Sequence, residues 1–111
     1  MNWIPLDEEE QLEKIIERSQ NTPQVIFKHS TRCSVSSMAK NRLDKNDNPE
    51  GIDFYYLDLI KHRNLSNKIA EDFKVQHQSP QILIIRDGKC TYTESHSAIM
   101  MDEIVAESLE S

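Results

Sequence analysis

Short apolar runs alternate with amphipathic stretches along the whole chain. The first amphipathic stretch begins after Asp7, which stands three residues before Glu10 as in a helix-capping box. Its apolar positions recur at helical spacing and predict a helix that ends near Ser19: Leu12, Ile15 and Ile16. Residues 24–29 form a β-branched and aromatic run that is typical of a buried strand. The pattern therefore opens with a helix and a strand, and Trp3-Ile4 is a candidate for a short strand before them.

The middle of the chain repeats this order of helix and strand. Apolar residues at helical spacing after the first strand predict a second helix with one apolar face: Cys33, Val35, Met38, Ala39 and Leu43. Residues 45–51 have the composition of a loop, and residues 52–59 are typical of a second strand. A third helix is predicted by another apolar stripe: Leu65, Ile69, Ala70 and Phe73.

The last third of the chain predicts a hairpin and a closing helix. Residues 82–85 and 89–94 flank Asp87-Gly88, a dipeptide that strongly favours a two-residue hairpin turn. The closing helix is marked by apolar residues at helical spacing: Met101, Ile104, Val105 and Leu109. Two strands joined through a crossover helix run parallel, whereas the hairpin adds an antiparallel edge. We therefore predict one α/β domain over residues 1–111 of thioredoxin-like topology, with a central mixed sheet, helices on both faces and a C-terminal antiparallel hairpin.

Charge and composition exclude several classes of protein. The 111 residues carry 13 Lys and Arg against 19 Asp and Glu, a formal net charge of −6, which disfavours nucleic acid as a partner. The first ten residues lack the basic and apolar regions of a secretory signal, and no apolar run is long enough to span a bilayer. Two cysteines are too few for a disulfide scaffold. We therefore expect a cytoplasmic protein without nucleic-acid or membrane partners.

Cys33 stands where a strand gives way to a helix. Ligand sites of open α/β sheets gather at the carboxyl ends of parallel strands, which is where this residue falls. A thiol reacts as the thiolate, and the unpaired N–H groups of a first helical turn favour that negative form. Arg32 adds a positive charge next to it. A lone cysteine is more often a buried, inert thiol, but this position favours a nucleophile.

No second thiol is placed to resolve a disulfide at Cys33. Ser36 occupies the position of the resolving thiol in a two-cysteine motif, and its hydroxyl can stabilise a thiolate but cannot form a disulfide. Cys90 follows the hairpin turn, roughly 20 Å along the strand from the opposite end, whereas a disulfide needs Cα atoms within about 7 Å. His29 and His96 are candidate bases, but their spacing is not that of metal ligands, so we expect no metal site.

Pro80 stands at the entrance of a predicted central strand, the position where a strand tolerates proline. In the thioredoxin topology this proline lies opposite the active-site cysteine and follows a cis peptide bond. Such a bond would expose the Ser79 backbone to pair with an extended substrate. A trans proline that merely ends a loop is the alternative, but its pairing with Cys33 favours the cis prediction.

Three segments together resemble a known family: FKHSTRCSVSS (27–37), QHQSPQ (76–81) and DGKCTYTESHSAI (87–99). They resemble the YtxJ family, the monothiol bacilliredoxin-like proteins of bacteria that use bacillithiol. The likeness extends over nearly the whole chain, from Trp3 to the last helix. It implies a thioredoxin-like fold and the removal of bacillithiol from mixed disulfides on cytoplasmic proteins.

The resemblance also implies roles for single residues. Cys33 would be the attacking thiol, and three neighbours would shape its site: Thr31, Arg32 and Ser34. Ser79 and Pro80 would form the substrate-binding element that faces it.

The leading hypothesis is a monothiol thiol–disulfide oxidoreductase. The Cys33 thiolate attacks the bacillithiol sulfur of a protein mixed disulfide, and an external thiol or reductase then reduces the Cys33–bacillithiol disulfide. Bacillithiol is a co-substrate here, and no tightly bound cofactor is needed. The choice of bacillithiol over another low-molecular-weight thiol rests on the resemblance.

Two other classes of function remain as alternatives. The first is a thioredoxin-fold thiol sensor or binding module that is modified at Cys33 without turnover. The second is an iron–sulfur carrier like the single-cysteine glutaredoxins, whose active-site loop contains a glycine that residues 33–36 lack.

Overall fold

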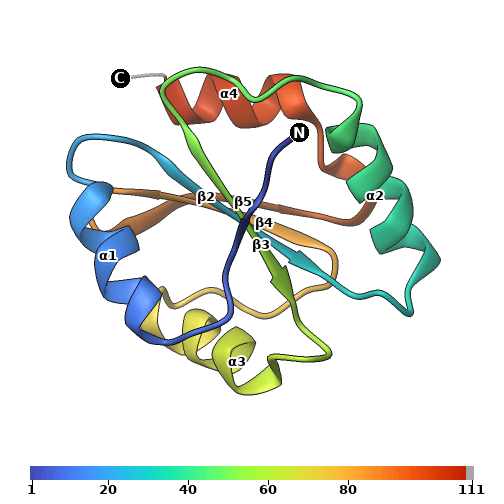
Figure 1. Ribbon diagram of the computed structural model, residues 1–111, viewed down its shortest axis with the longest axis horizontal. Helices are drawn as coiled ribbons and strands as arrows, with labels where there is room; N and C mark the ends of the chain where they lie inside the picture. The colour runs from blue at the N-terminus through green and yellow to red at the C-terminus, as the bar shows by residue number, and fades with distance from the viewer. Residues whose placement is uncertain (110–111) are drawn as a thin grey trace.

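A five-stranded mixed sheet separates two layers of helices in the computed structural model, which describes residues 1–109 (Figure 1). Helices α1 and α3 cover one face of the sheet, and α2 and α4 cover the other. The sheet order is β1-β3-β2-β4-β5. The elements in chain order are β1 (Ile4–Pro5), α1 (Glu10–Arg18), β2 (Gln24–His29), α2 (Ser34–Asp44), β3 (Asp53–Asp58), α3 (Arg63–Asp72), β4 (Gln81–Arg86), β5 (Lys89–Ser95), the 3₁₀ turn η1 (His96–Ala98) and α4 (Met101–Leu109).

Strand β2 lies at the centre of the sheet, and all six of its residues are buried. It pairs in parallel with β3 and antiparallel with β4, as the sequence predicts. Because alternate side chains of a strand point to opposite faces, Ile26 packs in the core beneath α1 and α3. Val25 and Phe27 pack in the core beneath α2 and α4. The predicted thioredoxin-like α/β fold is therefore confirmed.

The predicted hairpin is formed by β4 and β5. Its turn residues have the positive φ angles of a type I′ turn, 53° at Asp87 and 76° at Gly88. Strand β5 is the edge of the sheet, and its side chains alternate between exposed and half-buried over most of its length. The short predicted N-terminal strand is also present as β1, which pairs in parallel with β3.

The predicted capping box at the start of α1 is wrong. The helix begins at Glu10, and no side chain caps it. The Gln11 side-chain oxygen instead accepts hydrogen bonds from the backbone N–H groups of Asp7 (2.8 Å) and Glu8 (3.0 Å). Its amide nitrogen donates to the Pro5 carbonyl (2.8 Å). Gln11 therefore satisfies the backbone that enters the helix, because an amide offers both a donor and an acceptor.

The predicted apolar face of α2 is also wrong in part. Val35 and Met38 are 41% and 61% exposed. The buried positions are Ser36, Ala39 and Leu43. The helix begins only after residue 33, so its inward face is set by residues three and four positions apart from Ser36 onward.

Strand β2 also carries a fully buried charged side chain. Lys28 points towards α3, where its Nζ donates to the Ser66 carbonyl (3.0 Å) and lies 3.4 Å from Nδ1 of His77. Burial lowers the pKa of Lys28 from 10.5 to about 8. The ammonium is disfavoured there because water is excluded and no carboxylate of residues 1–109 forms an ion pair with it.

The burial of Lys28 should make the free energy of unfolding depend on pH. The folded chain binds fewer protons than the unfolded chain between pH about 8 and 10.5, so the free energy of unfolding should increase as the pH rises across that interval, by roughly 3 kcal/mol at most. Lys28→Met should remove this increase and should be at least as stable as the wild type at pH 7. Urea unfolding of both proteins from pH 7 to 10 measures the effect, and parallel pH curves would contradict it.

Candidate functional site

Three connections meet at one end of the sheet, where β2 ends and β4 begins (Figure 1). Strand β2 ends at His29, and Cys33 lies in the connection to α2. Gln81 pairs with Lys28, so the segment that ends at Pro80 enters the sheet at the same end. The backbone N–H of His96 donates to the Pro80 carbonyl (3.1 Å), which brings the start of η1 there as well. The fold thus gathers Cys33 and the Ser79-Pro80 element in one region.

Cys33 is the N-cap residue of α2, with an extended backbone (φ −113°, ψ 120°). Its N–H donates to the Ser30 carbonyl (3.2 Å), and its own carbonyl accepts from Ser37 (3.0 Å). The thiol is free and half-buried. The N–H groups of the first turn have no acceptor within the helix, and the helix dipole adds positive potential there. The structure therefore confirms that Cys33 lies at the N-terminus of α2, the place in the fold that the sequence predicts.

The Ser36 hydroxyl is committed to the backbone and to a histidine. It lies 2.6 Å from His29 Nδ1 and accepts a hydrogen bond from the N–H of Ser30 (3.0 Å). Ser36 is fully buried. The sequence-based expectation was a hydrogen bond to the Cys33 thiolate, whereas the structure uses this hydroxyl to tie the end of β2 to the first turn of α2. Ser36 therefore fixes the backbone on which Cys33 is presented.

His29 is a buried partner of Ser36. Its ring stacks on Phe27, with centroids 5.8 Å apart, and contacts Tyr56 at 5.6 Å. Burial lowers the pKa of His29, and the nearby charge of Lys40 lowers it further. The ring is thus a neutral imidazole at pH 7 with Nδ1 occupied. The side chain of the other candidate base, His96, is exposed, and this residue contacts the region through its backbone N–H, which donates to the Pro80 carbonyl.

The residues around Cys33 lie on the surface. Thr31, Arg32 and Ser34 are all exposed. Arg32 forms no ion pair with any side chain of residues 1–109, so its charge is available to a ligand or to the thiolate. Thr31 and Arg32 belong to the turn before Cys33, and Ser34 is the first residue of α2.

The Ser79–Pro80 peptide bond is cis, as predicted. Pro80 is buried, and Ser79 is half-buried. The Ser79 hydroxyl oxygen is shielded from solvent and has no hydrogen-bond partner among the described residues. Buried polar groups are normally paired, so this hydroxyl lacks a partner that such a group usually has.

Cys90 lies at the opposite end of the sheet. It pairs with Ile85, which is next to Gln24 at the start of β2. Five strand steps separate Gln24 from His29, roughly 16 Å. The Cys90 thiol donates to the Tyr92 carbonyl (3.3 Å), and burial raises the pKa of this thiol. The structure therefore confirms that Cys90 cannot form a disulfide with Cys33 in one chain.

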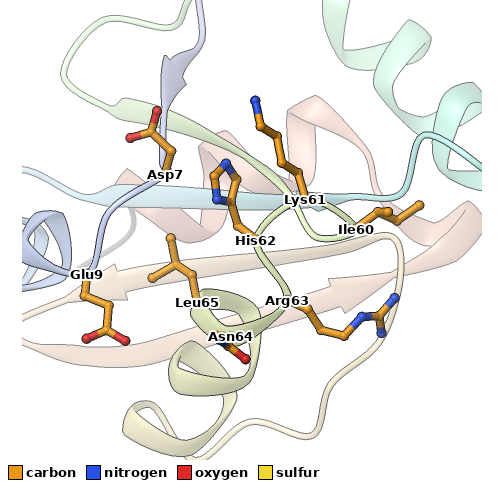
Figure 2. Close-up of a pocket in the computed structure, with 8 residues that line it drawn as sticks. All are labelled: Asp7, Glu9, Ile60, Lys61, His62, Arg63, Asn64 and Leu65. Carbon is orange, nitrogen blue, oxygen red and sulfur yellow. The ribbon is translucent and has the colours of Figure 1, made fainter.

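A surface pocket of about 360 Å³ lies between the β1–α1 connection and the start of α3 (Figure 2). It is lined by both acidic and basic side chains, and none of the site residues predicted from the sequence is among them. Figure 2 shows Arg63 pointing away from Asp7 and Glu9. Arg63 instead acts on His77, whose pKa is lowered by burial first, then by Lys28 and Arg63.

Lys28 and His77, which contact each other close to Ser79 and Pro80, are not predicted as site residues from the sequence. The available signal was a lysine that directly follows the apolar residues 25–27 within a strand predicted to be buried. Within residues 1–109, no three His, Cys, Asp or Glu side chains are grouped so that they could hold a metal ion. None of the helices described is both long and apolar enough to cross a membrane.

Removal of the Ser36 hydroxyl should destabilise the fold. Ser36→Ala would leave His29 Nδ1 and the N–H of Ser30 without their partner, and we expect a loss of about 1–3 kcal/mol. Ser37→Ala, one residue further along the same helix and half-exposed, is the matched control and should change stability by less than about 0.5 kcal/mol. Urea unfolding at pH 7 compares them, and equal losses would contradict the role given to Ser36.

Comparison with solved structures places the fold among thioredoxins. A candidate oxidoreductase with a thioredoxin fold shares 30% identity, with 94% of this chain and 91% of that chain covered and a TM-score of 0.81. Thioredoxin from Fasciola hepatica is 16% identical over 94% of this chain and 97% of that one, with a TM-score of 0.76. Thioredoxin Mala s 13 from Malassezia sympodialis is 17% identical over 95% and 86%, with a TM-score of 0.72.

A family model gives a more specific result. The model of the monothiol bacilliredoxin BrxC matches residues 4–104, which include every site residue predicted from the sequence. YtxJ is another name of that family, so the resemblance seen in the sequence is confirmed. Together with the thioredoxin-fold neighbours, this match supports a role in thiol redox chemistry. The chain belongs to the monothiol bacilliredoxin (BrxC) family.

Proposed function

We propose that this protein is a thiol–disulfide oxidoreductase that removes bacillithiol from mixed disulfides on cytoplasmic proteins. The observation that carries the proposal is the position of Cys33, a free thiol at the N-terminus of α2, at the same end of the sheet as Ser79 and Pro80. The other cysteine, Cys90, lies at the far end of the sheet. Membership of the monothiol bacilliredoxin family supports the choice of bacillithiol as co-substrate.

The proposed reaction is one thiol–disulfide exchange. The Cys33 thiolate attacks the bacillithiol sulfur of a protein–S–S–bacillithiol bond, forms a Cys33–S–S–bacillithiol bond and releases the protein sulfur as a thiolate, which takes a proton from solvent. No net oxidation occurs in this step, because one disulfide replaces another. A second thiol from outside the chain must then attack the mixed disulfide on Cys33. An external low-molecular-weight thiol or reductase is therefore a required partner.

The surrounding residues have separate roles in this proposal. Arg32 is next to Cys33 in the chain and exposed, so its positive charge is free to meet a carboxylate of the small thiol. Thr31 and Ser34 lie two residues before and one residue after Cys33, and both offer exposed hydroxyl groups. Ser79 offers an unpaired hydroxyl and backbone to the protein part of the substrate.

Single-cysteine variants test the reaction. A model protein carrying bacillithiol on one cysteine should lose it to wild-type protein and to Cys90→Ser at rates within about twofold of each other. Cys33→Ser should remove no bacillithiol. Mass spectrometry of the intact proteins follows the transfer, and an adduct is expected on Cys33 alone.

Two outcomes of this experiment would contradict the proposal. Transfer that survives Cys33→Ser would place the chemistry elsewhere. An adduct that forms on Cys33 under oxidant stress, without release of bacillithiol from the model protein, would identify a thiol sensor instead.

The Ser79 hydroxyl gives a second prediction. Ser79→Ala leaves no partner unsatisfied among the described residues, so stability should stay within about 0.5 kcal/mol of the wild type. If the hydroxyl donates to the bound substrate, the rate of exchange with the model protein should fall about tenfold, the equivalent of one hydrogen bond. Stopped-flow kinetics measures the rate, and an unchanged rate would exclude Ser79 from substrate binding.

A further inference from the structure

A buried cation lies directly behind the segment that carries Ser79 and Pro80. The Lys28 side chain is fully buried, and its Nζ lies 3.0 Å from the Ser66 carbonyl and 3.4 Å from His77 Nδ1. Burial of an ammonium is unfavourable unless its donors are satisfied, and an apolar residue would suit this position in a central strand better. The presence of a lysine at this position is therefore explained better by its contacts with Ser66 and His77 than by a contribution to the stability of the core.

Lys28 and Gln81 support the same segment from one rung of the sheet. The two residues are paired across β2 and β4, so their side chains lie on the same face. The Gln81 amide nitrogen donates to the Gln76 carbonyl (3.0 Å), and its oxygen accepts from the N–H of Gln78 (3.4 Å). Lys28 contacts the residue between them, His77. Residues 76–78 are thus held at three consecutive positions just before Ser79 and Pro80.

The contact with Lys28 also determines the state of the imidazole. An ammonium can only donate hydrogen bonds, so Nδ1 of His77 must act as the acceptor and the ring proton must be on Nε2. Ser66 is the other group near Nδ1, with its hydroxyl at 3.4 Å. His77 is an exposed residue, but partial desolvation of its ring, Lys28 and Arg63 together lower its pKa, which favours the neutral ring at pH 7. A doubly protonated ring would face the ammonium with a second donor, and the contact would break.

We propose that Lys28 is a positioning residue: through His77 it holds the Gln78-Ser79-Pro80 segment in the shape that receives the protein part of the mixed disulfide. This inference rests on the proposed function and assigns Lys28 no contact with the reacting sulfur atoms. It separates two properties of the site. The reactivity of Cys33 depends on the turn and on the N-terminus of α2, whereas recognition of a protein substrate depends on the segment that Lys28 supports.

Two rates measured on each variant separate these properties. Alkylation of Cys33 by iodoacetamide, followed at that residue by mass spectrometry and apart from Cys90, reports reactivity without recognition, because this reagent is too small to need the facing segment. Exchange with a bacillithiolated protein reports recognition as well. Lys28→Met should lower the exchange rate at least tenfold, mainly through a higher KM, and should leave alkylation within twofold. Lys68→Met, which removes a surface lysine of α3 paired with Asp72, is the matched control and should change neither rate.

Variants of His77 test whether Lys28 acts through it. His77→Phe removes the acceptor and should match Lys28→Met, and the double variant should lose no more than either single variant. His77→Asn can place an oxygen near the position of Nδ1 and should lose less than His77→Phe. Additive losses in the double variant, or a parallel fall in alkylation, would overturn the proposal.

The ratio of the two rates should depend on pH in the wild type. As the pH falls below 6.5, the usual pKa of histidine, protonation of His77 should break its contact with Lys28, and the ratio of exchange to alkylation should fall. The charged groups acting on His77 are Lys28 and Arg63, and neither changes charge in this range. The ratio should stay flat in His77→Asn. A ratio that is flat in the wild type would contradict the mechanism.

Amide hydrogen exchange tests the inference apart from catalysis. Lys28→Met should speed exchange at residues 77–79 at least tenfold, with little change in α2. A wild type that shows no transfer from the bacillithiolated protein would refute the proposed function only. Unchanged protection of residues 77–79 in Lys28→Met would refute the positioning role, whatever the transfer assay shows.

Discussion

The burial of β2 between two helical layers is the constraint on which the rest of this structure depends. All six of its residues are buried, so the strand cannot slip in register without moving apolar side chains to the wrong face. Its parallel pairing with β3 and antiparallel pairing with β4 then bring the end of β2 and the start of β4 to the same end of the sheet. Cys33 and Pro80 lie there because Cys33 follows the last residue of β2 by four positions and Pro80 directly precedes β4.

The polar residues of β2 divide the strand into a structural end and a functional end. At its start, the buried Gln24 is satisfied by Tyr55 and Asp53, at 2.8 and 2.7 Å. At its finish, His29 meets Ser36 on one face of the sheet, and Lys28 meets His77 on the other. The residue on one face therefore supports the turn that carries Cys33, and the residue on the other face contacts the segment that leads to Ser79 and Pro80. Consecutive residues of one strand can serve both because their side chains point in opposite directions.

The sequence was most informative where local chemistry determines structure. Asp87-Gly88 predicts the hairpin because its residues tolerate positive φ, and the strand-to-helix change predicts Cys33 at the N-terminus of α2. Partners from distant parts of the chain could not be predicted in this way. Lys28 meets groups 38 and 49 residues away. The apolar spacing of Val35 suggested a core position, but the exact start of α2 turned that residue outward.

The geometry also explains why the proposed reaction would require a thiol from outside the chain. The position that would hold a resolving thiol is filled by Ser36, whose hydroxyl is fully buried and engaged with His29 and Ser30. The sulfur of Cys90 is separated from Cys33 by the length of β2. A disulfide formed on Cys33 therefore has no route to an internal thiol and persists until an external thiol attacks it. In the proposed exchange the adduct is thus a defined product, and the exposed turn before Cys33 leaves it open to that second molecule.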